Sequence, residues 1–144
     1  MQDYKSQIQI FKIGGNILEH PPDLNNVLNQ MRKLKAENKI QKICLIPGGG
    51  TLANFVRYLD KELGLNKHDS HWMAIYAMEY NGIQLCNNHE DITPVKNIQE
   101  ILTSSSIFLH VFLPLNFLKK NDVLPHDWSV TSDSISIYLA SVFN

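Results

Sequence analysis

The chain has 144 residues, a length typical of one domain, with 44% hydrophobic and 19% charged residues. Its 13 basic and 14 acidic residues give a formal net charge of −1, which argues against nucleic acid as a partner. No run reaches the roughly 18 apolar residues of a membrane span, and the first nine residues are too polar for a signal peptide, so we expect one cytoplasmic domain over residues 1–144 without a membrane partner.

The first half of the chain predicts two strands, each followed by a helix. Residues 7–13 alternate apolar and polar side chains and run into two glycines, which indicates a strand that ends in a tight turn. Pro21, Pro22 and Asp23 open a helix whose apolar positions recur at helical spacing through about Asn38. Residues 42–46 predict a short buried strand, and the following helix is expected to begin near Thr51 as its N-cap and to stop at Gly64.

The second half continues the alternation of helices and strands. In order, it predicts a helix from Asp69 or Ser70 to about Tyr80, a short strand at 83–86, a short helix at 97–102, a strand at 107–113, a helical turn at 114–118 and a helix from about Ser132. Strands that alternate with helices indicate an α/β protein with a mainly parallel sheet.

Two glycine-rich turns, at residues 12–16 and 47–50, each follow a predicted strand and precede a helix. Glycines allow the backbone to approach a ligand closely, and backbone N–H groups at a helix start favour an anion. Lys12 lies at the end of the first strand, where its ammonium could neutralise a transferring phosphoryl group. Neither turn fits the Walker or the dinucleotide pattern. The alternative is a pair of structural turns beside a surface lysine.

A third candidate segment spans residues 124–134, which read Leu-Pro-His-Asp-Trp-Ser-Val-Thr-Ser-Asp-Ser. Thr131 or Ser132 can cap the last helix, and Asp133 then lies in its first turn, where a carboxylate interacts favourably with the helix dipole. The functional alternative is that Asp133 pairs with Lys12 and holds it in a site. The residues by themselves leave both interpretations open.

Three motifs in this order resemble the amino acid kinase superfamily: Lys-x-Gly-Gly at 12–15, Pro-Gly-Gly-Gly at 47–50 and Thr-Ser-Asp at 131–133. The runs at 70–75 and 124–135 are similar to the archaeal-type members that resemble the aminomethylfuran phosphate kinase of methanofuran biosynthesis. The resemblance covers essentially the whole chain. It implies a three-layer α/β/α sandwich with a mainly parallel sheet, like the N-terminal part of carbamate kinase.

The resemblance also implies an activity and a set of site residues. The activity would be phosphoryl transfer from ATP, with Mg²⁺, to a small phosphorylated or carboxylated metabolite. Lys12 would contact the transferred group, and Asp133 would organise the catalytic lysines. Binding of phosphate and substrate would fall to Gly14, Gly15, Asn16, Gly48, Gly49, Gly50, Arg57, His126 and Ser132. Arg57 could equally be a solvated helix position, and Asn16 stands where serine is usual.

Members of this superfamily continue well beyond the helix that begins near Asp133, and the later part supplies the nucleotide pocket. We therefore expect the substrate-side half of such a kinase, weak or inactive without a partner. The alternative is a non-catalytic phosphate-binding, metabolite-binding or scaffold subunit. An exposed sheet edge would favour a homo-oligomer or a hetero-complex in either case. The histidines show no metal-ligand spacing, so the sequence predicts no metal site.

Overall fold

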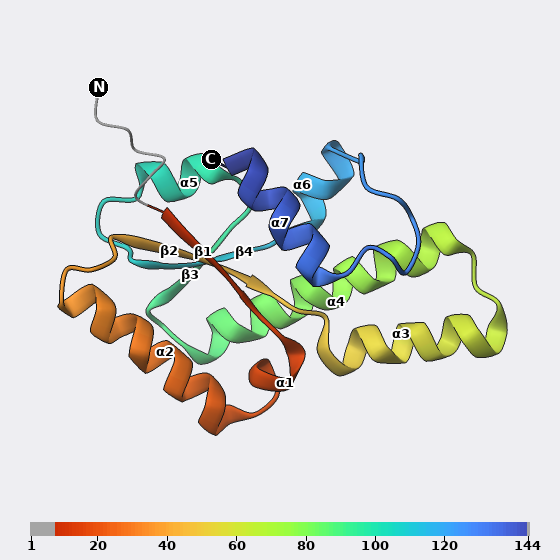
Figure 1. The fold of residues 1–144 in the computed structure, drawn as a ribbon, viewed down its shortest axis with the longest axis horizontal. Coiled ribbons are helices and arrows are strands. Elements are labelled where there is room, and N and C mark those ends of the chain that lie inside the picture. Colours follow the sequence, from red (N-terminus) through yellow and green to blue (C-terminus); the bar gives the residue numbers. More distant parts are fainter. Residues whose placement is uncertain (1–7, 144) are drawn as a thin grey trace.

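Four short apolar segments form a parallel sheet in the order β1-β2-β4-β3 (Figure 1). The computed structural model describes residues 8–143, so Gln7, the first residue of the first predicted strand, lies outside the described part. The strands are β1 (Ile8–Ile13), β2 (Lys42–Pro47), β3 (Ile92–Val95) and β4 (Leu109–Phe112). The helices are α1 (Gly15–Leu18), α2 (Pro21–Ala36), α3 (Gly50–Leu63), α4 (Lys67–Asn88), α5 (Ile98–Thr103), α6 (Leu115–Lys120) and α7 (Ser132–Phe143).

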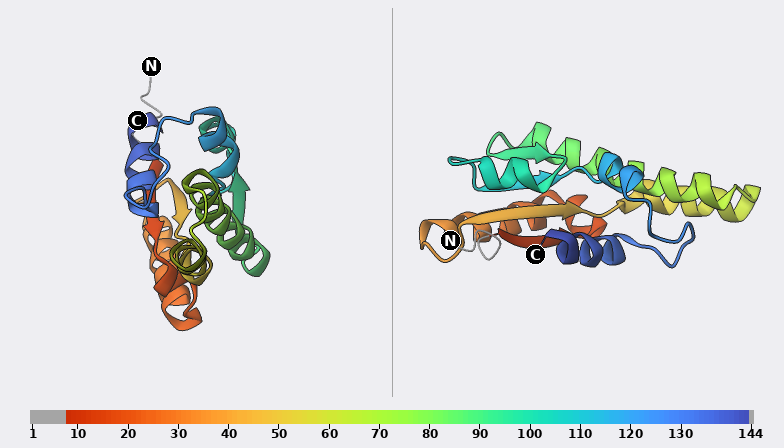
Figure 2. Two further views of the ribbon diagram at one scale, coloured as in Figure 1. Left: turned by 90° about the vertical axis from the view of Figure 1, so that its right-hand side faces the viewer. Right: turned by 90° about the horizontal axis from the view of Figure 1, so that it is seen from above.

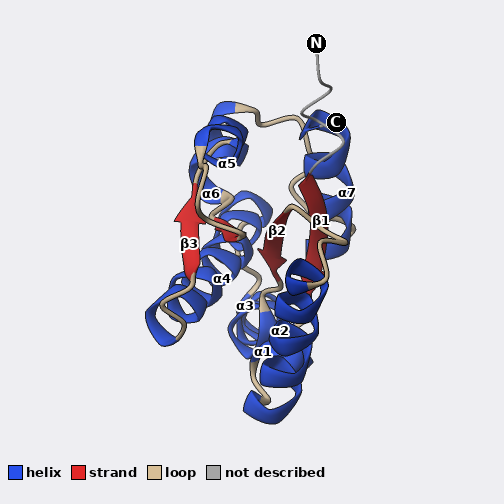
Figure 3. Cartoon of the chain, turned by 90° about the vertical axis from the view of Figure 1, so that its left-hand side faces the viewer, coloured by secondary structure: helices blue, strands red, loops and turns tan. Residues whose placement is uncertain are grey.

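Helices cover both faces of this sheet, because the two central strands are apolar on both sides. Ile43 and Leu45 of β2 face a core that contains α2 and the second half of α4. Cys44 and Ile46, between and after them, face a core that contains α5, α6 and α7. The strands consequently run through the middle of the molecule with helices around them (Figure 3). This architecture confirms the predicted three-layer α/β/α sandwich with a parallel sheet.

The register of β1 and β2 places the two glycine turns side by side. Ile13 pairs with Pro47 at the carboxyl ends of the strands, and the N–H of Gly48 donates a 2.8 Å hydrogen bond to the carbonyl of Ile13. A Cβ atom on Gly15 would lie 2.3 Å from the α-carbon of Gly50. The two turns therefore pack backbone against backbone, at a separation that only glycine permits.

The largest departure from the sequence prediction is the length of α4. A helix that stops near Tyr80 and a strand at 83–86 were expected, but α4 continues unbroken through both segments to Asn88. Gly82, just beyond the predicted helix end, faces the side chains of Leu113 and Pro47, and a Cβ there would lie 2.8 Å from Leu113. This glycine therefore provides close packing of the helix on the sheet. The strand lies further on, at β3.

Two helix starts also differ from the expected ones. The side chain of Asn66 caps α4 by accepting a 2.8 Å hydrogen bond from the N–H of His68, so the helix begins before Asp69. Helix α3 begins at Gly50, and Thr51, expected as its N-cap, lies in its first turn. Two other predicted boundaries are confirmed: α3 stops at Gly64, which has a φ of 62°, and α7 begins at Ser132.

Helices α3 and α4 form a pair that extends well beyond the strands (Figure 2). The short turn at residues 64–66 joins them, and they pack on each other along their length. The second half of α3 and the first half of α4 lie beyond the sheet, so the pair forms one wall of the space above the strand ends. Among residues 8–143, none of the helices combines the length and the apolar character that a membrane crossing requires.

Candidate functional site

A cavity of about 940 Å³ opens at the carboxyl ends of β1 and β2. This is the edge where parallel α/β sheets place their ligands, because turns and helix starts gather there. Six parts of the chain line it: the two glycine turns, α3, the first half of α4, the loop at 127–131 and the start of α7. The cavity therefore collects residues from both ends of the sequence.

The ammonium of Lys12 lies at the base of this cavity, over the first glycine turn. Its Nζ atom is 3.0 Å from Oδ1 of Asp133, and it would be 3.3 Å from a Cβ atom on Gly14. The Lys12 side chain is 28% exposed and that of Asp133 is 72% exposed. The contact between Lys12 and Asp133 that the functional interpretation required is present, and it brings together residues 121 positions apart in the sequence.

Most of the sequence-predicted site residues meet at this cavity. The lining includes Lys12, Gly14, Gly15, Asn16, Gly49, Gly50, Arg57 and Ser132. Gly48, His126 and Asp133 are not among the lining residues, although Asp133 contacts Lys12, which is. A Cβ atom on Gly48 would lie 3.1 Å from the amide nitrogen of Gly15, so its position serves the packing of one turn on the other. The catalytic and binding roles of all these residues stay predictions.

The start of α3 already has a carboxylate partner, Glu19, which sequence reasoning missed. The N–H and the hydroxyl of Thr51 each donate a 2.6 Å hydrogen bond to Glu19. Gly50 has a φ of 56°, and a Cβ there would lie 2.2 Å from Oε1 of Glu19. A carboxylate at a helix start is favoured by the helix dipole. Because Glu19 already accepts hydrogen bonds at the start of α3, we expect an anion in the cavity to contact Lys12 and the first glycine turn. No local pattern around Glu19 signals this contact.

Arg57 reaches the cavity from α3 and lies against an aromatic ring. Its guanidinium carbon is 4.8 Å from the centroid of the Trp128 ring, within the range of a cation–π contact. The indole N–H of Trp128 in turn donates to Oδ2 of Asp60 at 2.5 Å, so the loop is fastened to α3. Among residues 8–143, Arg57 has no carboxylate partner. Its N–H groups are therefore available to an anionic ligand, and the sequence pattern did not indicate Trp128 or Asp60 as its neighbours.

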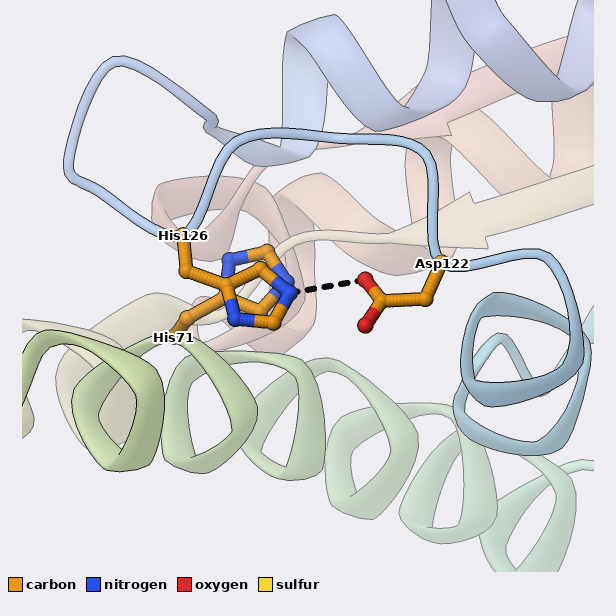
Figure 4. A group of neighbouring side chains, drawn as sticks. All are labelled: His71, Asp122 and His126. Atoms are coloured by element: carbon orange, nitrogen blue, oxygen red, sulfur yellow. Dashed lines mark hydrogen bonds and ion pairs between the residues drawn. The ribbon is translucent and has the colours of Figure 1, made fainter.

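His126 was predicted to line the pocket. It instead lies behind His71, which lines the cavity, and contacts His71 and His68. Nδ1 of His126 is 2.6 Å from Nδ1 of His68, and its Nε2 is 2.7 Å from Oδ1 of Asp122. The His126 ring stacks on that of His71, with centroids 4.2 Å apart, and His71 itself lines the cavity (Figure 4). Burial lowers the pKa of His71, the ring of His126 lowers it further, and Asp122 opposes the shift.

The fold and the site define a class of α/β protein, in which a lysine–aspartate pair lies beside a glycine-rich turn at the carboxyl end of a parallel strand. Residues 7–103 match the family described as the amino acid kinase family, and the chain belongs to this family. The chain is 32% identical over 142 residues to [5-(aminomethyl)furan-3-yl]methyl phosphate kinase from Methanocaldococcus jannaschii, a match that covers 95% of this chain and 62% of that protein. It is 26% identical over 86 residues to the uridylate kinase of Thermoplasma volcanium, with 60% of this chain and 38% of that protein covered. The chain thus spans less than two thirds of the length of either relative.

Proposed function

We propose that this chain forms the phosphoryl-binding and acceptor-binding side of an ATP-dependent small-molecule kinase. The observation that carries the proposal is the ammonium of Lys12, which is paired with Asp133 and lies over a glycine turn in a cavity of about 940 Å³. A fixed cation at this place would stabilise charge that develops on a phosphoryl group. We further propose that the chain acts as one domain in the cytoplasm, where ATP is abundant.

The residues present fit the charge of the groups that ATP and Mg²⁺ would bring. When bound, ATP supplies the phosphoryl group and Mg²⁺ neutralises part of its charge. Lys12, Arg57 and Lys67 bring positive charge to one cavity, and the glycine turn leaves no Cβ between Lys12 and a ligand. Oδ1 of Asp133 contacts Lys12, and the other oxygen of this exposed carboxylate would be the one offered to the metal ion. In this arrangement Lys12 binds and orients the phosphoryl oxygens, while Asp133 fixes the position of Lys12.

For the acceptor, we propose a phosphate monoester. Arg57 lies on the α3 wall, away from the glycine turn, and the face of Trp128 fixes its guanidinium plane. A guanidinium held in this way suits bidentate contact with a phosphate. The relative from Methanocaldococcus jannaschii is named for a methyl phosphate substrate, which agrees with this choice. Lys67, at the start of α4, faces the same cavity and would add a second positive charge.

The direct test measures ATP turnover by the purified chain with phosphate monoesters, alone and together with the products of neighbouring genes. Turnover that Lys12→Ala abolishes and that Lys33→Ala leaves unchanged would support the proposal. Lys33 is a suitable control because it is an exposed lysine on α2 with only a 4.0 Å contact to Glu37. No turnover in any combination would contradict a catalytic role.

Calorimetry separates this proposal from a non-catalytic alternative. Phosphate, pyrophosphate and ATP are titrated in turn into the wild-type chain. Binding of phosphate without binding of nucleotide would favour a phosphate-binding or scaffold subunit. If Lys12→Ala and Gly49→Val both leave anion binding unchanged, the cavity is not the anion site, and both interpretations lose their basis.

A further inference from the structure

Three imidazole rings and one carboxylate gather where the loop at 121–131 crosses α4. His71 projects from the first turns of α4, while Asp122 and His126 come from the loop (Figure 4). His68 lies one turn before His71 on the same helix. One nitrogen of His71, one nitrogen of His126 and one oxygen of Asp122 all lie within 4.8 Å of one another. The sequence showed no ligand spacing, because the loop and the helix contribute the residues from positions about 50 apart.

The ring of His71 is the part of this group that internal hydrogen bonding does not explain. His71 is only 7% exposed, yet among residues 8–143 its ring nitrogens make no hydrogen bond. Among residues 8–143, the fully buried side-chain atoms without a partner do not include the His71 nitrogens, which therefore reach the cavity that His71 lines. The ring stacks face to face on that of His126 at an interplanar angle of 15°, so at least one of the two rings must turn before both in-plane lone pairs can meet at one ion. An unpartnered nitrogen of His71 is thus open to a ligand.

The geometry points to a binding site for a divalent transition-metal ion of the zinc type, with His71, His126 and Asp122 as ligands. Imidazole nitrogens and a carboxylate oxygen are the donors that Zn²⁺ prefers, whereas Mg²⁺ prefers oxygen alone. Tetrahedral bonds of about 2.0–2.1 Å place two ligand atoms roughly 3.3 Å apart. Nε2 of His126 and Oδ1 of Asp122, now 2.7 Å apart, would separate slightly, and the more distant pairs would close.

His68 fits the role of the neighbour that orients a metal-bound histidine. A histidine that binds a metal through one nitrogen almost always donates a hydrogen bond from the other. If Nε2 of His126 binds the metal, its Nδ1–H faces Nδ1 of His68 at 2.6 Å. His68 is thus a positioning residue rather than a ligand. Two histidines and one carboxylate leave a coordination position for water or for another donor.

This metal would fasten the loop to α4 beside the candidate active site. The loop also carries Trp128, which supports Arg57, and His71 lines the cavity itself. The ion would therefore limit the motion of one wall of the cavity. The inference concerns these four side chains and does not depend on whether the chain transfers phosphate.

The test titrates Zn²⁺, and separately Co²⁺, into the full chain after treatment with a chelator. We expect one ion per chain, a tetrahedral Co²⁺ absorption spectrum without a thiolate band, and shifts in the imidazole nitrogen signals of wild-type His71 and His126. The cysteines are poor competitors, because burial raises the pKa of Cys86 to about 11 and that of Cys44 to about 12. Mg²⁺ under the same conditions is expected to leave the imidazole signals of His71 and His126 unshifted.

Variants assign the ligands. His71→Gln, His126→Gln and Asp122→Asn are each expected to weaken Zn²⁺ binding at least about 100-fold, and His68→Gln about 10-fold. His20→Gln is the matched control, since His20 also contacts a carboxylate, Asp23, at 2.9 Å but stands on the exposed start of α2. Zn²⁺ binding that survives in the His71→Gln/His126→Gln double variant would overturn the proposal. So would wild-type imidazole signals that do not shift, a result independent of how the variants fold.

Discussion

At the scale of single residues, the contact between the two glycine turns leads to the sharpest prediction. A methyl group on Gly15 would lie 2.3 Å from the α-carbon of Gly50, which is backbone and cannot rotate away. We expect Gly15→Ala to lower the free energy of unfolding by about 1–3 kcal/mol, as an overpacked core does. Because the turns must separate, phosphate binding should weaken as well. Urea unfolding and calorimetry measure the two effects.

Gly64→Ala provides the matched control for this substitution. Gly64 ends α3 with a φ of 62°, and a Cβ there would meet nothing within 4 Å. The variant should lose roughly 1 kcal/mol through backbone strain alone and should retain phosphate binding. If Gly15→Ala proves no more harmful than Gly64→Ala in either measurement, the close packing of the two turns is not what excludes a side chain.

His110 makes stability depend on pH. Its ring is fully buried on β4, and neither ring nitrogen has a hydrogen-bond partner among the described residues. Burial lowers the pKa of His110 below 6.5, although the nearby backbone of Ile43 and Phe108 partly opposes the shift. Below about pH 6.5 the unfolded chain therefore binds a proton that the folded chain does not. The contribution of His110 to the free energy of unfolding should be constant above that pH and should fall as the pH decreases further.

His110→Leu should reduce this dependence. Leucine has a similar volume and removes two unpartnered nitrogens, so stability near pH 8 should be unchanged or higher. The slope below pH 6.5 should become shallower without vanishing, because burial also lowers the pKa values of His71 and His89. Urea unfolding at a series of pH values provides the measurement. An unchanged slope would show that His110 is not protonated in the unfolding transition.

At the scale of elements, the sequence predicted those segments whose pattern is local. Strands β1 and β2 and helices α2 and α3 were predictable, because each combines a clear period with a glycine or proline boundary. The end of α4 was not, because Gly82 serves packing against Leu113, and only the fold shows that neighbour. Strand β3 escaped notice because it has four residues, one of them Pro94, and its burial depends on pairing with β4.

The site divides in the same way. The glycine turns and Lys12 carry a local signal, so they could be found before the structure was known. Glu19, Asp60 and Trp128 could not, since their hydrogen bonds and ring contacts join segments that only the fold brings together. The group around His126 is another example, because its members come from α4 and from a loop.

The start of α4 depends on one cap. The side chain of Asn66 accepts a hydrogen bond from the N–H of His68, and no other side-chain cap is present at this helix start among the described residues. Asn66→Ala should therefore lower the free energy of unfolding by about 1 kcal/mol. Asn88→Ala, at the last residue of the same helix, is the control and should have almost no effect. Equal losses in the two variants would contradict a specific capping role for Asn66.

At the scale of the whole molecule, the outer face of the α3–α4 pair bears more exposed apolar surface than a solvated helix pair requires. We refer to this face as the α3–α4 surface, and its large exposed side chains are Leu52, Phe55, Met73, Tyr76 and Tyr80. An open groove of about 770 Å³ runs among them and includes few polar atoms. Contiguous apolar surface of this kind usually meets another protein. The sequence analysis expected an oligomer because of an exposed sheet edge. The α3–α4 surface is a different region of the molecule.

We predict that the chain self-associates through the α3–α4 surface. Light scattering on the wild-type chain should give at least twice the chain mass of 16.5 kDa. Phe55→Glu places a charge at a side chain that is 55% exposed, so it should disrupt association while leaving the fold intact. Ile137→Glu is the control, since Ile137 is 71% exposed on α7, outside this surface. If Ile137→Glu dissociates the oligomer and Phe55→Glu does not, the interface lies beside α7 instead. A wild-type chain that is monomeric at high concentration would contradict self-association.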